Sequence, residues 1–293
     1  MQIKKTIAGI NSPEGLQEAL IDAQYIADSD LATASYLALA LGKPLLLEGV
    51  PGVGKTEAAK AITSILGKKL LRLQCYEGID SSSALYEWNY TRQILAIRQA
   101  KDEYINIYSD DFLISRPMYE ALTNPSDKVL LIDEIDRSDQ EFEAFLLEFL
   151  SDFSISIPER GTIHADDHPF VILTSNRTRE LHEALRRRCV YHWINYPTPE
   201  QEAEIVMLRA SSVAQATSQA VVRAVNALRK EPLIKPPGIA ETVEWAEAST
   251  ILNDQGDDWP LAFKRSIGLA IKDQEDFEYI HDRIDKILGE AVV

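Results

Sequence analysis

The segment Gly49-Val50-Pro51-Gly52-Val53-Gly54-Lys55-Thr56 decides the fold of this chain. It fits the pattern GxxxxGK[ST] and lies between the apolar run Pro44-Leu45-Leu46-Leu47-Glu48 and a segment of helical character over 55–66. Glycines in such a loop let backbone N–H groups curl around a phosphate chain, and the helix N-terminus adds positive potential. An ordinary Gly/Pro turn is the alternative. The strand and helix expected on either side favour a phosphate-binding loop.

The motif assigns roles to individual residues. Lys55 is expected to reach the β- and γ-phosphates of ATP, and the hydroxyl of Thr56 is expected to hold Mg²⁺. We assign nucleotide binding to residues 49–56 and to Glu57. Tyr25 and Ile26, which precede the first predicted helix, are assigned to the adenine, although packing onto the core explains them equally well. ATP and Mg²⁺ are therefore the expected cofactors.

Composition and charge describe a globular, acidic chain. Of its 293 residues 45% are hydrophobic and 26% are charged, and 30 basic against 46 acidic residues give a net charge of −16. This charge argues against general binding to nucleic acid or to anionic membranes, since both need a basic face. No apolar stretch reaches the ~18–20 residues of a membrane span, and no signal-type apolar core follows residues 1–5. With Cys75 and Cys189 too few for a disulfide framework, we expect a cytoplasmic protein.

Apolar runs alternate with helical segments through the first two thirds of the chain. After the run at 44–48, strands are expected at 70–74, 129–132, 170–174 and 190–194, and helices at 30–41, 55–66 and 92–101. The helix at 30–41 is expected to have Asp30 as its N-cap and to end at Gly42. Strands that alternate with helices imply βαβ crossovers, and so an α/β fold with a parallel sheet.

The pattern becomes helical after Tyr196-Pro197-Thr198-Pro199. Thr198 and Gln201 form a predicted capping box, with Pro199 at the first helical position. Helices are expected at 199–210, 218–228, 240–252 and 260–271, followed by a last helix with Phe277, Ile280, Ile284, Ile287 and Leu288 on one face. The predicted organisation is an αβα nucleotide-binding core over 1–197 and a small helical lid domain over 198–293.

Two acidic residues follow the apolar run at 129–132. Asp133 lies just past the strand, where a carboxylate can join the Mg²⁺ shell. The adjacent Glu134 is expected to polarise an attacking water and to act as the general base of hydrolysis. An Asp-Glu pair at a strand end is often only solvated. Its place between the phosphate-binding loop and two further strands favours the catalytic interpretation.

A polar amide and an arginine cluster complete the predicted site. Asn176 follows the run at 170–174 and can hydrogen-bond the γ-phosphate or the attacking water, whereas capping of a turn is the alternative. Arg186-Arg187-Arg188 close a helix that is expected to begin near Arg179. Arginine stabilises charge on a transferring phosphoryl group, in cis or from a neighbouring subunit. A basic helix C-terminus that complements the helix dipole explains part of the run equally well.

Together these motifs resemble those of AAA+ ATPases. Phe153-Ser154-Ile155-Ser156-Ile157, a turn at 158–161 and Thr162-Ile163-His164 form a predicted hairpin, similar to the pre-sensor-1 hairpin of the branch that holds MoxR ATPases, magnesium chelatase and dynein-like motors. Residues 76–90 occupy the place of that branch's helix-2 insert. The runs Leu131-Ile132-Asp133-Glu134-Ile135-Asp136-Arg137, Leu173-Thr174-Ser175-Asn176-Arg177-Thr178-Arg179-Glu180-Leu181-His182, Ala184-Leu185-Arg186-Arg187-Arg188-Cys189 and Pro237-Gly238-Ile239-Ala240-Glu241-Thr242 resemble the CoxD-like branch of the MoxR family.

The resemblance implies a ring, expected to be a hexamer, with ATP at the subunit boundaries. Asn176 then corresponds to sensor 1. Arg188 best fits the arginine finger, because it occupies the arginine position of the family's Leu-x-x-Arg pattern, and Arg187 is the second choice. Arg137 is a further candidate for a contact with a neighbouring subunit.

One feature departs from the pattern of many AAA+ proteins. Their lids carry a sensor 2 arginine where this chain has Glu241-Thr242, and no arginine lies between Lys230 and Lys264. Either a neighbouring subunit supplies that positive charge or the lid senses ATP weakly. We therefore assign no sensor 2 residue.

The resemblance also implies partners. MoxR relatives typically work with a protein that bears a von Willebrand factor A domain, and they act as chaperones that mature protein complexes. CoxD-like members are associated with assembly of the metal centre in molybdenum-containing carbon monoxide dehydrogenases. The expected function is Mg²⁺-dependent ATP hydrolysis coupled to maturation of such a metalloenzyme client. The alternatives are an ATP-gated interaction module with little turnover, and a magnesium-chelatase-like or nucleic-acid-acting motor.

Overall fold

The computed structural model describes residues 9–100, 104–157 and 160–292, and these fall into two compact units. The first unit comprises residues up to Ala23, Ala27–Gly49 and Lys55–Trp193. The second comprises Gln24–Ile26, Val50–Gly54 and the chain from Ile194 onward. The expected chain start at 1–5, the helix end at Lys101 and the turn residues 158–159 lie outside the described residues.

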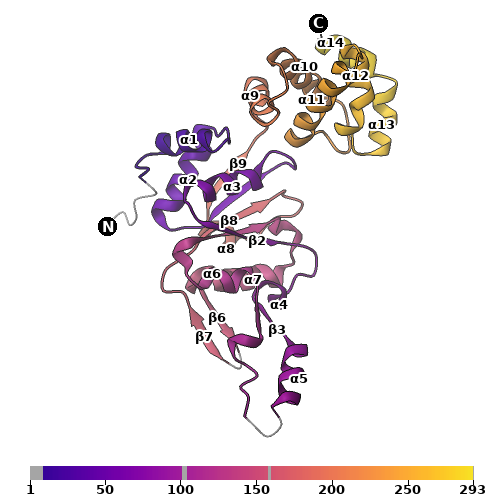
Figure 1. Cartoon of the computed structure of the whole chain (residues 1–293). Helices are drawn as coiled ribbons and strands as arrows, with labels where there is room; N and C mark the ends of the chain where they lie inside the picture. Colours follow the sequence, from indigo (N-terminus) through magenta and orange to yellow (C-terminus); the bar gives the residue numbers. More distant parts are fainter. Residues whose placement is uncertain (1–8, 101–103, 158–159, 293) are drawn as a thin grey trace. The chain divides into compact units, whose positions relative to one another are not determined.

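A five-stranded sheet forms the centre of the first unit (Figure 1). Its strand order is β2-β5-β8-β1-β9. Its strands are β1 Leu45–Gly49, β2 Lys69–Gln74, β5 Lys128–Asp133, β8 Phe170–Ser175 and β9 Val190–Ile194. The ladders that join β2 to β5, β5 to β8 and β8 to β1 are all parallel, which confirms the predicted class. Strands β1, β5 and β8 are buried along their whole length, as expected for a parallel sheet covered on both faces.

Helices cover both faces of this sheet (Figure 1). Helices α2 (Ser29–Leu41) and α3 (Lys55–Ile65) lie on one face, and α6 (Pro117–Leu122) and α7 (Gln140–Asp152) lie on the other. The apolar stripe of α7 is buried in the core at Phe142, Leu146 and Phe149. Helix α1 (Pro13–Asp22), which packs on α2, was not anticipated.

Two excursions leave the sheet. The first contains α4 (Ser81–Ala84), β3 (Tyr86–Trp88), α5 (Tyr90–Gln99), η1 (Asp110–Phe112) and β4 (Leu113–Ser115), and its strands β3 and β4 pair antiparallel. The second is an antiparallel hairpin of β6 (Ser154–Ile157) and β7 (Gly161–His164), as predicted. Short 3₁₀ turns, η2 (Pro125–Asp127) and η3 (Ile135–Arg137), precede and follow β5.

Two predicted helix starts in the first unit are wrong. Helix α2 begins at Ser29, and its N-cap is Asp28, whose carboxylate accepts from Leu31 N at 2.7 Å, so Asp30 lies inside the first turn. Helix α8 spans only Glu183–Arg188 and does not begin near Arg179. The preceding residues are tied to other segments instead, because His182 N donates to Glu143 and the Arg179 guanidinium donates to Ser138 O.

The second unit is helical and has its own core. It contains α9 (Pro199–Arg209), α10 (Gln215–Leu228), α11 (Ile239–Asp254), α12 (Trp259–Ser266), η4 (Ile267–Leu269), α13 (Gln274–His281) and α14 (Ile284–Val292). The capping box of Thr198 and Gln201 is present. The core is built around Trp245 and Phe263, whose rings meet edge to face. Within the described ranges, no helix is long and apolar enough to cross a membrane.

The single last helix that was predicted is two helices. Helix α13 ends at His281 with Asp282 as its C-cap, and Arg283 N donates to Ile280 O in a tighter turn before α14 begins. Ile280, Ile284 and Ile287 are all buried, so the apolar spacing continues across the break. That spacing is helical on both sides, which is why the sequence did not indicate the turn.

Both thiols are expected to resist labelling in the folded protein. Burial raises the pKa of Cys75 and of Cys189 to about 12, and at Cys75 the charges of Asp133, Asp136 and Glu134 add to this rise. The thiolate fraction at pH 8 should therefore be about a thousandfold or more below that of an ordinary cysteine. Labelling with a disulfide reagent, followed by mass spectrometry, should modify both cysteines only after denaturant is added. Rapid modification of either thiol without denaturant would contradict this burial.

Candidate active site

The loop Val50–Gly54 joins β1 to α3. Gly52 and Gly54 have φ of 80° and 92°, which a residue with a side chain rarely adopts. A Cβ on Gly54 would lie 3.7 Å from the Cε2 atom of Tyr25, so Tyr25 lies against this loop, and Ile26 follows in the same unit. The backbone of the loop is therefore shaped for close approach of a ligand, and one of the two adenine candidates is next to it.

Lys55 is the first residue of α3 and is only 6% exposed. Its Nζ atom donates to Gly49 O at 2.8 Å, at the end of β1. Burial lowers the pKa of Lys55, whereas the negative charges of Asp136, Asp133 and Glu134 act in the opposite direction. The ammonium group is thus held at the end of β1, within reach of the charges of the acidic residues that end and follow β5.

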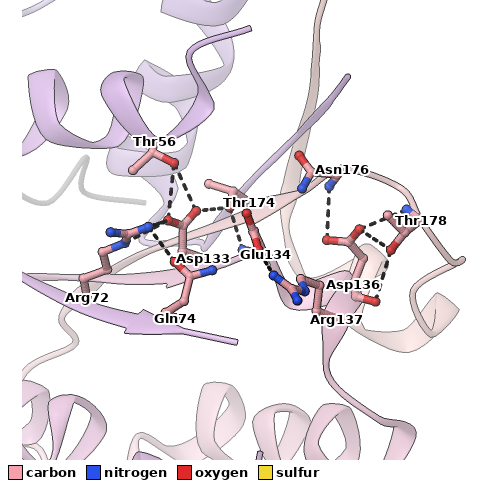
Figure 2. Close-up of polar contacts among 10 residues, drawn as sticks. All are labelled: Thr56, Arg72, Gln74, Asp133, Glu134, Asp136, Arg137, Thr174, Asn176 and Thr178. Atoms are coloured by element: carbon pink, nitrogen blue, oxygen red, sulfur yellow. Dashed lines mark hydrogen bonds and ion pairs between the residues drawn. The ribbon is translucent and has the colours of Figure 1, made fainter. Parts of the chain in front are cut away.

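Asp133, at the end of β5, collects contacts from three other elements (Figure 2). Its carboxylate is buried and lies 3.2 and 3.3 Å from the hydroxyl of Thr56 on α3. The hydroxyl of Thr174 on β8 donates to Oδ1, and the guanidinium of Arg72 on β2 donates to Oδ2. The two residues that were predicted to hold Mg²⁺ are therefore together, and Arg72 and Thr174 are additional members of the site.

Glu134 follows in a left-handed conformation with φ of 55°. Its backbone N–H donates to Thr174 Oγ1 at 2.9 Å, and its carboxylate pairs with Arg137 at 3.0 Å (Figure 2). The side chain of Glu134 is one third exposed and that of Arg137 is more than half exposed, so the pair stabilises the fold little. The predicted general base, Glu134, thus follows the predicted metal ligand Asp133 directly in the chain, and Arg137 in the next turn donates to its carboxylate.

Asn176 is held by Asp136, which the sequence had not assigned a role. The carboxylate of Asp136 accepts from Asn176 N at 3.1 Å and from the N–H and hydroxyl of Thr178 at 2.9 and 2.7 Å (Figure 2). Burial acts to raise the pKa of Asp136, but these hydrogen bonds outweigh it and the pKa is lowered. A buried, ionised carboxylate therefore joins the turn after β5 to the end of β8.

The arginine cluster lies at the end of α8 and is not in contact with Asp133 or Glu134. Arg187 pairs with Glu183 within α8, and Arg186 lies over the Tyr191 ring at 5.3 Å. Arg188 is exposed, and no ion pair joins it to the described residues. Glu57, which was assigned to nucleotide binding, forms an ion pair with Lys60 on α3, with 2.6 Å between Nζ and Oε1.

The second unit contains a buried ion pair close to the point where a sensor 2 arginine was missing. Arg229 and Glu202 form a two-pronged pair with N–O distances of 2.7 and 2.8 Å. Thr242 donates to the same carboxylate at 2.8 Å, and Arg229 Nε donates to Pro237 O at 2.8 Å. Thr242 therefore serves this internal network, and the network fixes the turn that leads into α11.

That turn contacts the phosphate loop. Ile239 N, the first amide of α11, donates to Gly52 O at 3.0 Å. A Cβ on Gly238 would lie 2.8 Å from the Cα atom of Gly52, closer than any real side chain is found. Two glycines thus meet backbone to backbone, and this contact joins the loop to the start of α11 within the second unit.

Comparison with known proteins identifies the family. Residues 45–195 match the ATPase family associated with various cellular activities (AAA), and the chain belongs to that family. The matched range contains β1, the phosphate loop, Asp133, Glu134 and Asn176.

The individual relatives share low sequence identity with this chain. The chain is 27% identical over 169 residues to the chaperone MoxR1 of Mycobacterium tuberculosis, which covers 55% of this chain and 39% of MoxR1. It is 26% identical over 194 residues to YeaC of Bacillus subtilis, which covers 64% of this chain and 53% of YeaC. It therefore spans about half or less of these two relatives. The RuvB Holliday junction branch migration motor of Thermotoga maritima has a TM-score of 0.48 and 18% identity, covering 96% of this chain and 80% of that one.

Gly238→Ala is expected to weaken nucleotide binding. The φ of Gly238 is −84°, so alanine fits the backbone there, but its Cβ must displace the phosphate loop at Gly52. We expect a loss of about tenfold in affinity for ATP, or ~1.4 kcal/mol. The measurement is the Kd of a fluorescent ATP analogue. Gly268→Ala is the matched control, since a Cβ there meets open space, and equal affinities for the two variants would count against the contact.

Proposed function

We propose that the chain is a Mg²⁺-dependent ATPase that hydrolyses ATP at the end of β5 and drives the remodelling of a protein client. The observation that carries this proposal is the convergence of Thr56, Asp133 and Thr174, with Glu134 bound to Thr174 through its backbone N–H. In this proposal Thr56 and Asp133 are the oxygen ligands of Mg²⁺, Lys55 is the cation that binds phosphate, and Glu134 is the carboxylate that acts as the base.

The residues present suit Mg²⁺ and ATP. The Thr56 hydroxyl and the Asp133 carboxylate offer hard oxygen ligands, which Mg²⁺ prefers, and they lie 3.2 Å apart. The positive φ values of Gly52 and Gly54 are the backbone conformation with which such a loop can curl around a phosphate chain. When bound, Mg²⁺ supplies positive charge to the β- and γ-phosphates.

The chain's own residues then divide the work. Lys55 neutralises phosphate charge at the N-terminus of α3, and Asp133 holds its carboxylate toward Thr56. Glu134 accepts a proton from the attacking water, which requires that its carboxylate leave Arg137. Asn176 orients that water or the γ-phosphate, and Asp136 positions the backbone of Asn176.

A ring of subunits completes the site. We assign the arginine finger to Arg188, with Arg187 as the second choice, because Arg188 is exposed and unpaired among the described residues whereas Arg187 is engaged by Glu183. A finger supplied by a neighbouring subunit stabilises charge on the transferring phosphoryl group. Six subunits remain our expectation for the ring.

The client is proposed to be a metalloenzyme under assembly. Support comes from the 27% identity to the chaperone MoxR1 and from the CoxD-like sequence runs. In this proposal a protein with a von Willebrand factor A domain is the partner, and the client is a molybdenum-containing enzyme of the carbon monoxide dehydrogenase type. An interaction module that binds ATP with little turnover is the competing function.

Glu134→Gln should separate binding from hydrolysis. Glutamine keeps the shape of the side chain but cannot accept the proton, so turnover should fall by about a hundredfold or more. The affinity for ATP should stay within about twofold, since Lys55 and Thr56 are unchanged. Phosphate release and analogue binding measure the two quantities. Hydrolysis by Glu134→Gln at the wild-type rate would refute the assignment of Glu134 as the base. If the wild-type protein bound ATP tightly but did not hydrolyse it, the interaction module would be favoured.

Mixed rings test whether Arg188 acts across a subunit boundary. Arg188→Ala alone should hydrolyse ATP slowly, as should Glu134→Gln. In an equal mixture about a quarter of the boundaries would combine an intact Glu134 with an intact neighbouring Arg188, so activity should reappear. Steady-state ATPase rates across mixing ratios measure this effect. Arg187→Ala mixed in the same way is the control, and rescue with Arg187→Ala but not with Arg188→Ala would exchange the two roles.

A further inference from the structure

Arg72 reaches the site from a strand that the catalytic motifs do not include. In β2 the side chains alternate, so that Leu71 and Leu73 are buried whereas Arg72 and Gln74 face the other way. Strand β2 pairs in parallel with β5, and Gln74 lies opposite Asp133 in the register. This pairing brings Arg72 and Gln74 beside the end of β5.

The guanidinium of Arg72 binds one carboxylate oxygen of Asp133 with two of its nitrogens (Figure 2). Nε and Nη2 lie 2.9 and 2.5 Å from Oδ2. Nη2 also donates to Gln74 Oε1 at 2.5 Å, so the neighbouring side chain of the same strand holds the guanidinium in this orientation. The Arg72 side chain is half exposed, whereas Asp133 is buried.

The same oxygen faces the metal ligand Thr56. Thr56 Oγ1 lies 3.3 Å from Oδ2 of Asp133, the atom that Arg72 occupies. A divalent cation held by Thr56 and this carboxylate would therefore approach a guanidinium charge at short range. Two cations that share one carboxylate oxygen repel each other and divide its acceptor capacity.

We propose that Arg72 is a positioning residue that occupies Asp133 and competes with Mg²⁺ for its carboxylate. In the absence of Mg²⁺ it neutralises the buried charge of Asp133. Its half-exposed side chain can withdraw into solvent when the metal enters, while Thr174 keeps Oδ1 in place. Arg72 thereby sets the Mg²⁺ concentration at which the site becomes competent, an inference that rests on the proposed nucleotide site.

A purely structural role predicts the opposite result. If Arg72 only supported Asp133, its removal would leave the carboxylate badly oriented and would raise the Mg²⁺ requirement. If Arg72 competes, its removal lowers that requirement. The sign of the change separates the two roles.

The test uses Arg72→Gln in the full chain and a fluorescent, non-hydrolysable ATP analogue, whose binding is followed as Mg²⁺ is titrated. We expect the half-saturating Mg²⁺ concentration to fall by about fivefold to tenfold, the scale of losing one charged, hydrogen-bonded competitor. Arg72→Lys keeps the charge but cannot donate two hydrogen bonds to Asp133. Its half-saturating Mg²⁺ concentration should therefore lie between those of the wild type and Arg72→Gln. Arg98→Gln, an exposed arginine on α5, is the matched control and should leave the concentration unchanged.

Two further measurements keep the outcome decisive. Gln74→Ala frees the guanidinium without removing it and should lower the Mg²⁺ requirement by a smaller factor, which covers the case in which Arg72→Gln does not fold. Mn²⁺ binding with the analogue present, followed by electron paramagnetic resonance, should tighten in parallel. An unchanged or higher metal requirement in both variants overturns the competition. Absence of analogue binding in the wild type and in Arg98→Gln would instead overturn the proposed function.

Discussion

The carboxylate of Asp133 is the interaction on which the rest of the site depends. It is buried at the end of β5, and an isolated charge in such a place would destabilise the folded state by more than the stability of the fold. Hydroxyls from α3 and β8 and a guanidinium from β2 satisfy it. Side chains from α3, β2 and β8 are consequently held together at the end of β5.

A second buried carboxylate extends this arrangement. Asp136 is three residues beyond Asp133, and its hydrogen bonds to Asn176 and Thr178 fix the segment that follows β8. In the helical unit the buried carboxylate of Glu202 accepts from both Arg229 and Thr242. Arg229 also donates to Pro237 O, and these contacts fix the turn at Gly238. Loss of one partner from such a group leaves a buried charge without compensation, which makes these contacts far more costly to break than exposed pairs.

Local patterns predicted most of the first unit correctly. The phosphate loop, the five strands and the hairpin at β6 and β7 all follow from short-range spacing. The error at α2 is local, because Asp28 and Asp30 are both able to cap a helix and Asp28 does so. The error at α8 has a tertiary cause: the segment before it is not helical, because Glu143 and Ser138 bind its backbone and its arginine. The break between α13 and α14 was hidden because the apolar spacing runs through it unchanged.

By itself the sequence determined the phosphate loop, the α/β class and the acid pair at the end of β5, because each depends on residues within a few positions of one another. Only the tertiary structure decided what surrounds that pair. Arg72 and Thr174 are 61 and 41 residues from Asp133, and they meet it because β2 and β8 flank β5 in the sheet. Side chains that converge across parallel strands are joined by strand order, and no local spacing encodes that order.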